Sequence, residues 1–227
     1  MIGLPAHGFV LLSMPKCAST SLVQALQGRA ELVLRINPRL KHMNCQSFHT
    51  LMVPVLNNGG YRREDYELVS LFREPVAWIE SWWRYRQRPA LARDDPSKFT
   101  GEVSFEEFVG RYVDNDPRPG TLRGRPAKFI ALSDGLDIGV DRLFALEQPD
   151  VWKRWIDEKV GGGVDVQVDN RSKVRKEPEL SRTMRARLDE FFRPELEIYE
   201  RLRATGEWAP PRGYVPGTPS GGDPGSA

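Results

Sequence analysis

A junction between a short apolar strand and a helix near the N-terminus constrains the fold most. Residues 9–13 read Phe-Val-Leu-Leu-Ser and are bounded by turn residues, a pattern typical of a buried parallel strand. Residues 19–27 follow as a helix. Its apolar face carries Leu22, Ala25 and Leu26. A buried strand that leads through a loop into an amphipathic helix is the basic unit of α/β proteins.

The same alternation continues along the chain. Further strands are predicted at residues 32–36, 68–72 and 143–146. Helices are predicted from the spacing of apolar residues at 48–56, 79–83 and 184–202, the last with a kink or restart at Pro194. Strands that alternate with helices predict an α/β fold, arranged as three α/β/α layers around a mostly parallel central sheet.

Composition indicates one folded unit followed by a tail. The 227 residues are 40% hydrophobic and 28% charged, which is ordinary for a globular chain and too apolar for a disordered one. Ten glycines and prolines fall within residues 209–227, and such a segment cannot bury enough apolar surface to order itself. We therefore predict a single domain over residues 1–208 and a disordered tail over residues 209–227.

Charge and cysteine content argue against several classes of protein. The net charge of +2 does not fit a strongly basic nucleic-acid binder. Cys17 and Cys45 are too few for a disulfide framework or a four-cysteine zinc site. No apolar run approaches the roughly 20 residues that span a bilayer, and the start of the chain lacks a secretory-signal pattern. We expect a cytoplasmic protein without a metal, a nucleic-acid partner or a membrane span.

The loop at residues 13–22 reads Ser-Met-Pro-Lys-Cys-Ala-Ser-Thr-Ser-Leu and has the properties of a phosphate cradle. Its amides and the helix N-terminus attract anions, and Lys16 adds a full positive charge. The hydroxyls of Ser19, Thr20 and Ser21 add hydrogen-bond donors. The glycine-rich nucleoside-triphosphate loop is absent. An ordinary helix cap is the alternative, although a cap needs one such hydroxyl and no lysine.

A second anion-binding pattern follows the strand at residues 68–72. Arg73 stands at the end of this strand, and Ser81 lies two turns into the next helix. A guanidinium matches a phosphate through two hydrogen bonds, and a serine hydroxyl can add another. Lys16 and Arg73 both follow strands, so both are expected at the carboxyl edge of the sheet, where α/β proteins bind ligands. One ligand with two separated phosphate-like groups would explain both patterns.

These residues resemble a known family. Residues 15–22, Pro-Lys-Cys-Ala-Ser-Thr-Ser-Leu, are similar to the 5′-phosphosulfate loop of sulfotransferases that use 3′-phosphoadenosine 5′-phosphosulfate (PAPS). Arg73 with Ser81 eight positions later is similar to the same family's 3′-phosphate motif. The closest likeness is to bacterial and carbohydrate-type members. The resemblance implies a P-loop-like nucleotide-binding fold and transfer of a sulfuryl group to a hydroxyl or amine.

The resemblance also implies a role for each matching residue. Lys16 would contact the 5′-phosphosulfate and stabilise the departing phosphate oxygen. The donor-binding residues would be Pro15, Lys16, Cys17, Ala18, Ser19, Thr20 and Ser21 around the 5′ end, and Arg73 and Ser81 at the 3′-phosphate. The chemistry requires no metal.

Three further parts of the sequence complete the expected site. His42 lies between a strand and a helix near the same edge, and its near-neutral pKa suits a catalytic base. Glu147, after a later strand, is the alternative base. The basic segment 171–187 carries Lys173 and Arg175, which would close over the 3′-phosphate or over an anionic acceptor; a solvated face is the alternative.

The sequence therefore predicts a PAPS-dependent sulfotransferase that acts on a hydroxyl, or less readily an amine, of a glycan or other polar metabolite. A nucleotide kinase is one alternative, but it requires a Gly-Lys-[Ser/Thr] loop and an acidic magnesium ligand. A binding module that holds anions or nucleotides without chemistry is another. The identity of the acceptor and the oligomeric state are not indicated by any motif.

Overall fold

A six-stranded mixed sheet forms the centre of the fold. The computed structural model describes residues 1–166 and 178–217. The strands are β1 (Ile2–Leu4), β2 (Phe9–Leu12), β3 (Leu32–Val33), β4 (Glu67–Phe72), β5 (Arg142–Ala145) and β6 (Glu207–Trp208). Their order across the sheet is β3-β1-β2-β4-β5-β6. The prediction of an α/β fold is confirmed.

The three central strands are parallel and the outer pairings are antiparallel. Leu12 of β2 pairs with Ser70 of β4, and Phe72 of β4 pairs with Ala145 of β5. The pairings of β1 with β2, β1 with β3, and β5 with β6 are antiparallel. The expected mostly parallel sheet is therefore corrected to a mixed one. The short connection Pro5–His7, closed by Gly8 at φ 77°, leaves room only for an antiparallel return from β1 to β2.

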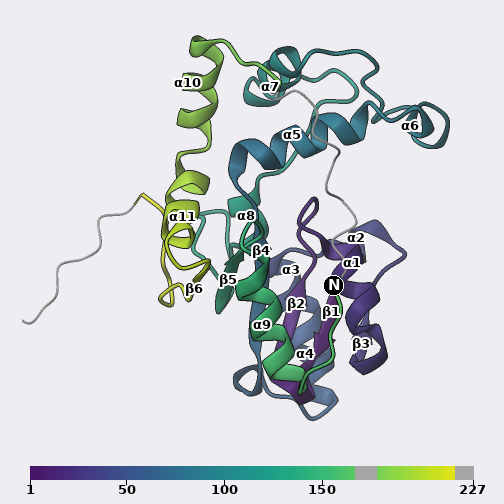
Figure 1. The fold of residues 1–227 in the computed structure, drawn as a ribbon, viewed down its shortest axis with the longest axis vertical. Helices are drawn as coiled ribbons and strands as arrows, with labels where there is room; N and C mark the ends of the chain where they lie inside the picture. Colours follow the sequence, from purple (N-terminus) through teal and green to yellow (C-terminus); the bar gives the residue numbers. More distant parts are fainter. Residues whose placement is uncertain (167–177, 218–227) are drawn as a thin grey trace, which may run out of the picture.

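Helices follow each parallel strand and build a second region beyond the carboxyl edge of the sheet (Figure 1). Near the sheet lie α1 (Ser19–Leu26), α2 (Pro38–Lys41), α3 (Cys45–Ser47), α4 (Val53–Asn58), α8 (Pro126–Ile130) and α9 (Pro149–Val160). The second region contains α5 (Pro75–Arg86), α6 (Pro89–Asp94), α7 (Phe105–Val113) and α10 (Arg182–Phe191). Helix α11 (Arg193–Arg203) contacts both β5 and α5.

The helix expected at residues 48–56 is interrupted. A π-helical turn, η3 (Phe48–Met52), separates α3 from α4, because Pro54 has no N–H to donate to the preceding turn. The wider turn rotates the helix, so Leu51 and Val55 of the expected apolar stripe are 55% exposed. The late helix does restart as expected, with a break between α10 and α11 at Phe192.

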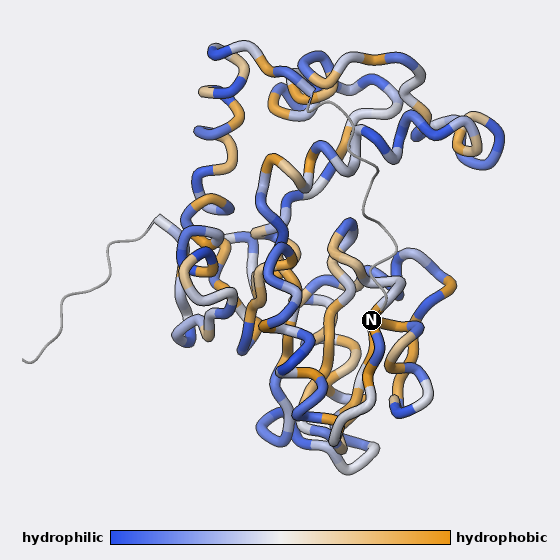
Figure 2. The backbone as a smooth tube through the Cα atoms, in the orientation of Figure 1, coloured by the Kyte–Doolittle hydropathy of each residue, from blue (hydrophilic) through white to orange (hydrophobic). Residues whose placement is uncertain are grey.

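Hydrophobic residues concentrate along the strands (Figure 2). All four residues of β2 and the last five residues of β4 are buried. The sheet therefore supplies a rigid core from which the loops after β2, β4 and β5 project. Among the described residues, each helix is too short or too polar to traverse a bilayer.

Residues 209–217 belong to the segment expected to be disordered, yet the structure places them against the folded unit. The Tyr214 ring lies 4.9 Å from the Trp208 ring, and the Tyr214 carbonyl accepts a hydrogen bond from the amide of Ile138 at 2.8 Å. The Tyr214 hydroxyl donates to Glu197 and accepts from Arg201. Residues 218–227 lie outside the described residues.

These contacts lead to a prediction about truncation. Deletion of residues 209–227 removes the packing of Tyr214 and should cost about 2 kcal/mol of unfolding free energy, a fall of roughly 4–8 °C in Tm. Deletion of residues 218–227 alone is the matched control and should leave Tm unchanged. Thermal denaturation followed by circular dichroism measures both. Equal Tm values for the two truncated proteins would show that Tyr214 adds nothing to stability.

Candidate functional site

The loop between β2 and α1 has an unusual backbone. Lys16 and Ala18 adopt positive φ values of 68° and 51°, which are uncommon for residues other than glycine and mark functional loops when they cluster. Ala18 is the N-cap of α1 and provides no side-chain hydrogen bond. The first amides of α1 therefore lack the Ser or Thr cap that would make the loop an ordinary helix start. This geometry favours an anion site at the N-terminus of α1.

The hydroxyl residues of the loop lie in the first turn of α1 and not at its cap. Ser19 and Ser21 are buried, and Thr20 is exposed and accepts a hydrogen bond from the Lys41 ammonium at 3.2 Å. Ser13, at the start of the loop, is 2% exposed and its hydroxyl has no hydrogen-bond partner among the described residues. Polar groups of this kind, buried without a partner, are rare in folded proteins unless a ligand or water completes them.

Helix α5 covers the loop with one face. The indole N–H of Trp78 donates to the Pro15 carbonyl at 3.1 Å. The Lys16 ammonium lies 4.2 Å from the centroid of the Tyr85 ring and 5.4 Å from that of Trp82. Ser81 is three residues after Trp78 and four before Tyr85, so it belongs to the same face of α5. The structure thus brings Lys16 and the Ser81 face together.

Arg73 connects the loop to the end of β4. Its Nη1 donates to the Lys16 carbonyl at 3.2 Å. Its Nε is buried without a hydrogen-bond partner among the described residues, and lies 4.0 Å from Glu147. Arg73 and Lys16 therefore share one site, at the carboxyl edge where both strands end.

Several cations converge on this site. Burial, followed by the positive charges of Arg88 and Arg73, lowers the pKa of Lys16 to about 8. The Arg88 guanidinium also lies 5.2 Å from the Tyr85 ring centroid. The neighbouring positive charges and burial raise the free energy of the charged form of Lys16. A bound anion would lower that free energy, so this site favours an anion.

His42 lies beside the same loop, just after α2. Its Nδ1 is 2.7 Å from the Ser13 carbonyl. Because a carbonyl only accepts, Nδ1 carries the proton and the neutral ring keeps its lone pair on Nε2. Burial, with smaller contributions from Lys41 and Lys16, lowers the pKa of His42 below its usual value of 6.5. The ring is therefore held in the form that accepts a proton.

Glu147 is engaged as a structural acceptor. It accepts hydrogen bonds from the Glu74 amide at 3.1 Å and from the Tyr199 hydroxyl at 3.2 Å. Burial and the charge of Glu147 raise the pKa of Tyr199. These contacts join the end of β5 to α11 and to the N-terminus of α5, and they orient the carboxylate toward Arg73.

Other expected site residues differ in what they can contribute. Cys17 is fully buried, and burial raises the pKa of its thiol to about 12, so it stays neutral and serves packing. Lys173 and Arg175 lie outside the described residues.

The sequence analysis did not identify Tyr85 and Arg88 as site residues. The aromatic residues at positions 78, 82 and 85, which fall on one helix face, were the available signal for this side of the site. Within the described ranges, no group of three or more acidic, histidine or cysteine side chains is arranged to hold a metal.

Comparison with protein-family models and with curated proteins finds no match for this chain.

Proposed function

We propose that the chain is a PAPS-dependent sulfotransferase that acts on a hydroxyl of a glycan or other polar metabolite. The observation that carries the proposal is the direct contact between the two anion-binding elements. Arg73 donates to the Lys16 carbonyl while the face of α5 that includes Ser81 covers the same loop. A donor with phosphate groups at both the 5′ and the 3′ positions fits two such elements that meet at one edge.

The proposed roles follow from the charges and hydrogen bonds of these residues. The loop amides, Thr20 and Ser21 would bind the 5′-phosphate, and Arg73 with Ser81 would bind the 3′-phosphate. The sulfuryl group would pass to the acceptor oxygen as the bond between sulfur and the 5′-phosphate oxygen of the donor breaks, and adenosine 3′,5′-bisphosphate would leave. Lys16 would stabilise the negative charge that develops there, an effect that is often the largest in catalysis.

His42 completes the proposed mechanism as the base. Its Nε2 would take the proton of the acceptor hydroxyl as the new bond to sulfur forms. Both Glu147 hydrogen bonds and its position beside Arg73 favour a positioning role over that of a base. The proposal includes a P-loop-like, three-layer nucleotide-binding architecture, which the strand–loop–helix geometry supports. It also includes a cytoplasmic location.

Nucleotide binding tests this function without knowledge of the acceptor. Adenosine 3′,5′-bisphosphate should bind in the absence of added metal. Lys16→Ala and Arg73→Ala should each weaken binding by about 1.5–3 kcal/mol, the value of a charged hydrogen bond. Isothermal titration calorimetry measures these affinities.

A control variant and a second nucleotide show whether the binding is specific. Lys153 also lies over an aromatic ring, that of Trp152, at 5.7 Å, so Lys153→Ala is the matched control and should bind normally. ATP, which has no 3′-phosphate for Arg73, should bind more weakly. Wild-type protein that fails to bind the bisphosphate, or that binds magnesium ATP more tightly, would contradict the proposal.

A further inference from the structure

A loop that follows β3, at one edge of the sheet, combines exposed apolar and basic side chains. It comprises residues 35–41, which read Arg-Ile-Asn-Pro-Arg-Leu-Lys, and is called the 35–41 loop below. Ile36 is 86% exposed, more than any other large hydrophobic residue in the described part of the chain, and Leu40 is 44% exposed. Single exposed aliphatic side chains are common on protein surfaces, so the surroundings of these two decide whether they mark an interface.

The sequence around the loop lacks negative charge. Between Glu31 and Glu64 the chain contains no aspartate or glutamate, although 31 of its 227 residues are acidic. The loop itself carries three cations, Arg35, Arg39 and Lys41. None of these three side chains contacts a carboxylate within residues 1–166 and 178–217. The two exposed aliphatic side chains are therefore flanked by positive charges without counter-ions in the described ranges.

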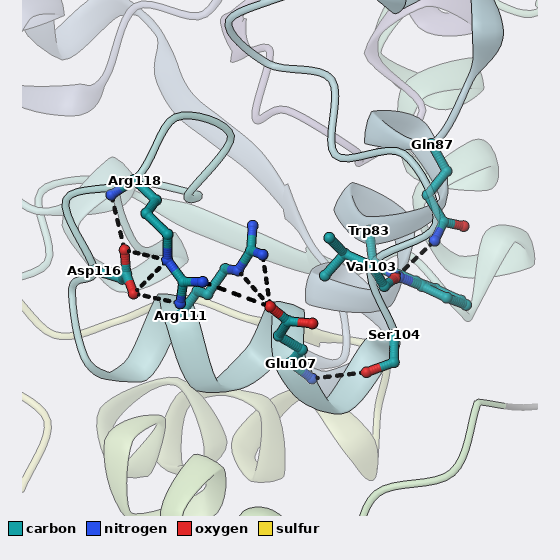
Figure 3. Close-up of polar contacts among 8 residues, drawn as sticks. All are labelled: Trp83, Gln87, Val103, Ser104, Glu107, Arg111, Asp116 and Arg118. Atoms are coloured by element: carbon teal, nitrogen blue, oxygen red, sulfur yellow. Dashed lines mark hydrogen bonds and ion pairs between the residues drawn. The ribbon is translucent and has the colours of Figure 1, made fainter.

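The arginines around α7 are arranged differently. The Glu107 carboxylate accepts a hydrogen bond from Arg111 and also pairs with Arg118, while Asp116 accepts from Arg118 (Figure 3). Paired charges of this kind largely cancel and leave little net field beyond the pair. The cations of the 35–41 loop keep their full field, so this part of the surface attracts anions.

The 35–41 loop is held in one conformation at its base and at its turn. The amino nitrogen of Met1 donates to the carbonyls of Leu34 at 3.1 Å and Lys41 at 2.7 Å, which brings the two ends of the loop together. At the turn, the Asn37 side chain accepts from the Arg39 amide at 2.9 Å and caps α2. A fixed backbone therefore presents the aliphatic side chains, which lowers the entropy cost of docking.

An anionic lipid surface matches this combination better than other partners do. Aliphatic side chains enter the boundary between headgroups and acyl chains, while flanking arginines and lysines stay at the anionic headgroups. An acidic polysaccharide would use the cations but would gain little from Ile36. A stable protein partner would need about 800 Å² on this side, far more than two aliphatic side chains provide.

We propose that the 35–41 loop docks the protein on an anionic lipid surface. Ile36 and Leu40 enter the headgroup boundary, and Arg35 and Arg39 lie at the negative groups of the lipids. Docking of this kind requires no helix that crosses the bilayer. It goes beyond the sulfotransferase function proposed above, because it needs neither donor nor acceptor.

The loop ends beside the proposed reaction centre. The Lys41 ammonium donates to the Thr20 hydroxyl at 3.2 Å, and His42 follows Lys41 directly. A docked protein would therefore hold the connection between β2 and α1 close to the headgroups. If the proposed function also holds, a hydroxyl carried at the lipid surface would be the acceptor nearest to His42.

Vesicle sedimentation of the whole chain tests the docking. Phosphatidylcholine vesicles with about 30% phosphatidylserine should sediment about half of the protein at about 1 mM lipid and low salt, and pure phosphatidylcholine vesicles should sediment almost none. An increase from about 0.05 M to about 0.5 M salt should release most of the bound protein, because salt screens exposed charges. Equal binding to both kinds of vesicle, or binding to neither, would overturn the proposal.

A matched pair of double variants tests the cations. Arg35→Gln with Arg39→Gln should lower the partition coefficient about 25-fold, from about 5-fold for each charge. Arg193→Gln with Arg203→Gln makes the same charge change at exposed positions of α11, on the far side of the sheet from α2 (Figure 1). That variant should bind within about twofold of wild type. An equal loss in both double variants would show that net charge alone drives binding, and would overturn the assignment to the loop.

A second pair of variants tests the apolar contact. Ile36→Ser should lower the partition coefficient at least about 5-fold, because this side chain leaves water on docking. Leu51 is 55% exposed but belongs to η3, outside the loop, so Leu51→Ser should bind as wild type does. All the variants replace exposed side chains, so their Tm should lie within about 2 °C of wild type. Equal losses in Ile36→Ser and Leu51→Ser would indicate general adhesion and overturn the proposal.

The outcomes also separate the docking from the proposed function. Vesicle binding without affinity for adenosine 3′,5′-bisphosphate would leave the docking standing and remove the sulfotransferase function. Bisphosphate binding without vesicle binding would do the reverse. Protein that binds heparin, does so equally well as Ile36→Ser, and does not bind the anionic vesicles would assign the cations to an acidic polymer and overturn the lipid surface.

Discussion

Replacement of His42 by alanine is expected to reduce turnover by about 10²–10⁴-fold, the usual contribution of a general base. The reason lies in the ring's hydrogen bond. The Ser13 carbonyl fixes the proton on Nδ1, so the ring presents a neutral Nε2. Affinity for adenosine 3′,5′-bisphosphate should change little, because the base acts on the acceptor. The acceptor for this assay is found as the metabolite that gains a sulfuryl group in mass when protein and PAPS are added.

His7 offers a matched control for this measurement. Its Nδ1 also lies near a backbone carbonyl, that of Lys159 at 3.3 Å, but it precedes β2 at the opposite end of the strand from the loop. His7→Ala should therefore retain wild-type turnover. If His42→Ala turns over within about threefold of wild type, the base is another group, and Glu147→Gln becomes the variant to measure.

The fold could be predicted from sequence where apolar runs were long and separate. The buried runs of β2, β4 and β5 stand out, and they are the parallel centre of the sheet. Strands β1 and β6 were missed because two or three residues show no periodicity and pair only through contacts distant in sequence. Those short antiparallel strands are what changed an expected mostly parallel sheet into a mixed one.

In the candidate site too, the features that depend on local sequence could be predicted, and the features that depend on contacts between distant segments could not. The loop after β2 and the arginine after β4 could be located from sequence, because each follows a strand. The contact of the Lys16 ammonium with Tyr85 and the approach of Arg88 could not, since they depend on how α5 lies across the loop.

Removal of the Lys16 ammonium is expected to lower kcat by about 10²–10³-fold, the cost of one preorganised group that stabilises the leaving oxygen. The pH dependence provides a sharper test. With the pKa of Lys16 at about 8, the charged form is lost as the pH rises through that value, so kcat/KM for PAPS should fall above about pH 8. Below neutrality it should fall as His42 gains its proton, at a pH under 6.5 because the pKa of His42 is lowered.

Two variants assign the alkaline limb to Lys16. Lys16→Arg keeps a charge that does not titrate, so the alkaline limb should disappear while overall activity drops, because a planar guanidinium cannot reproduce the point charge of an ammonium. Arg88→Gln removes the largest of the neighbouring charges that lower the pKa of Lys16, so the alkaline limb should move upward. The acid limb should be the same in both variants, since it belongs to His42. An alkaline limb that stays near pH 8 in Lys16→Arg would show that another group titrates there, and would leave Lys16 as a binding residue without a role in the transition state.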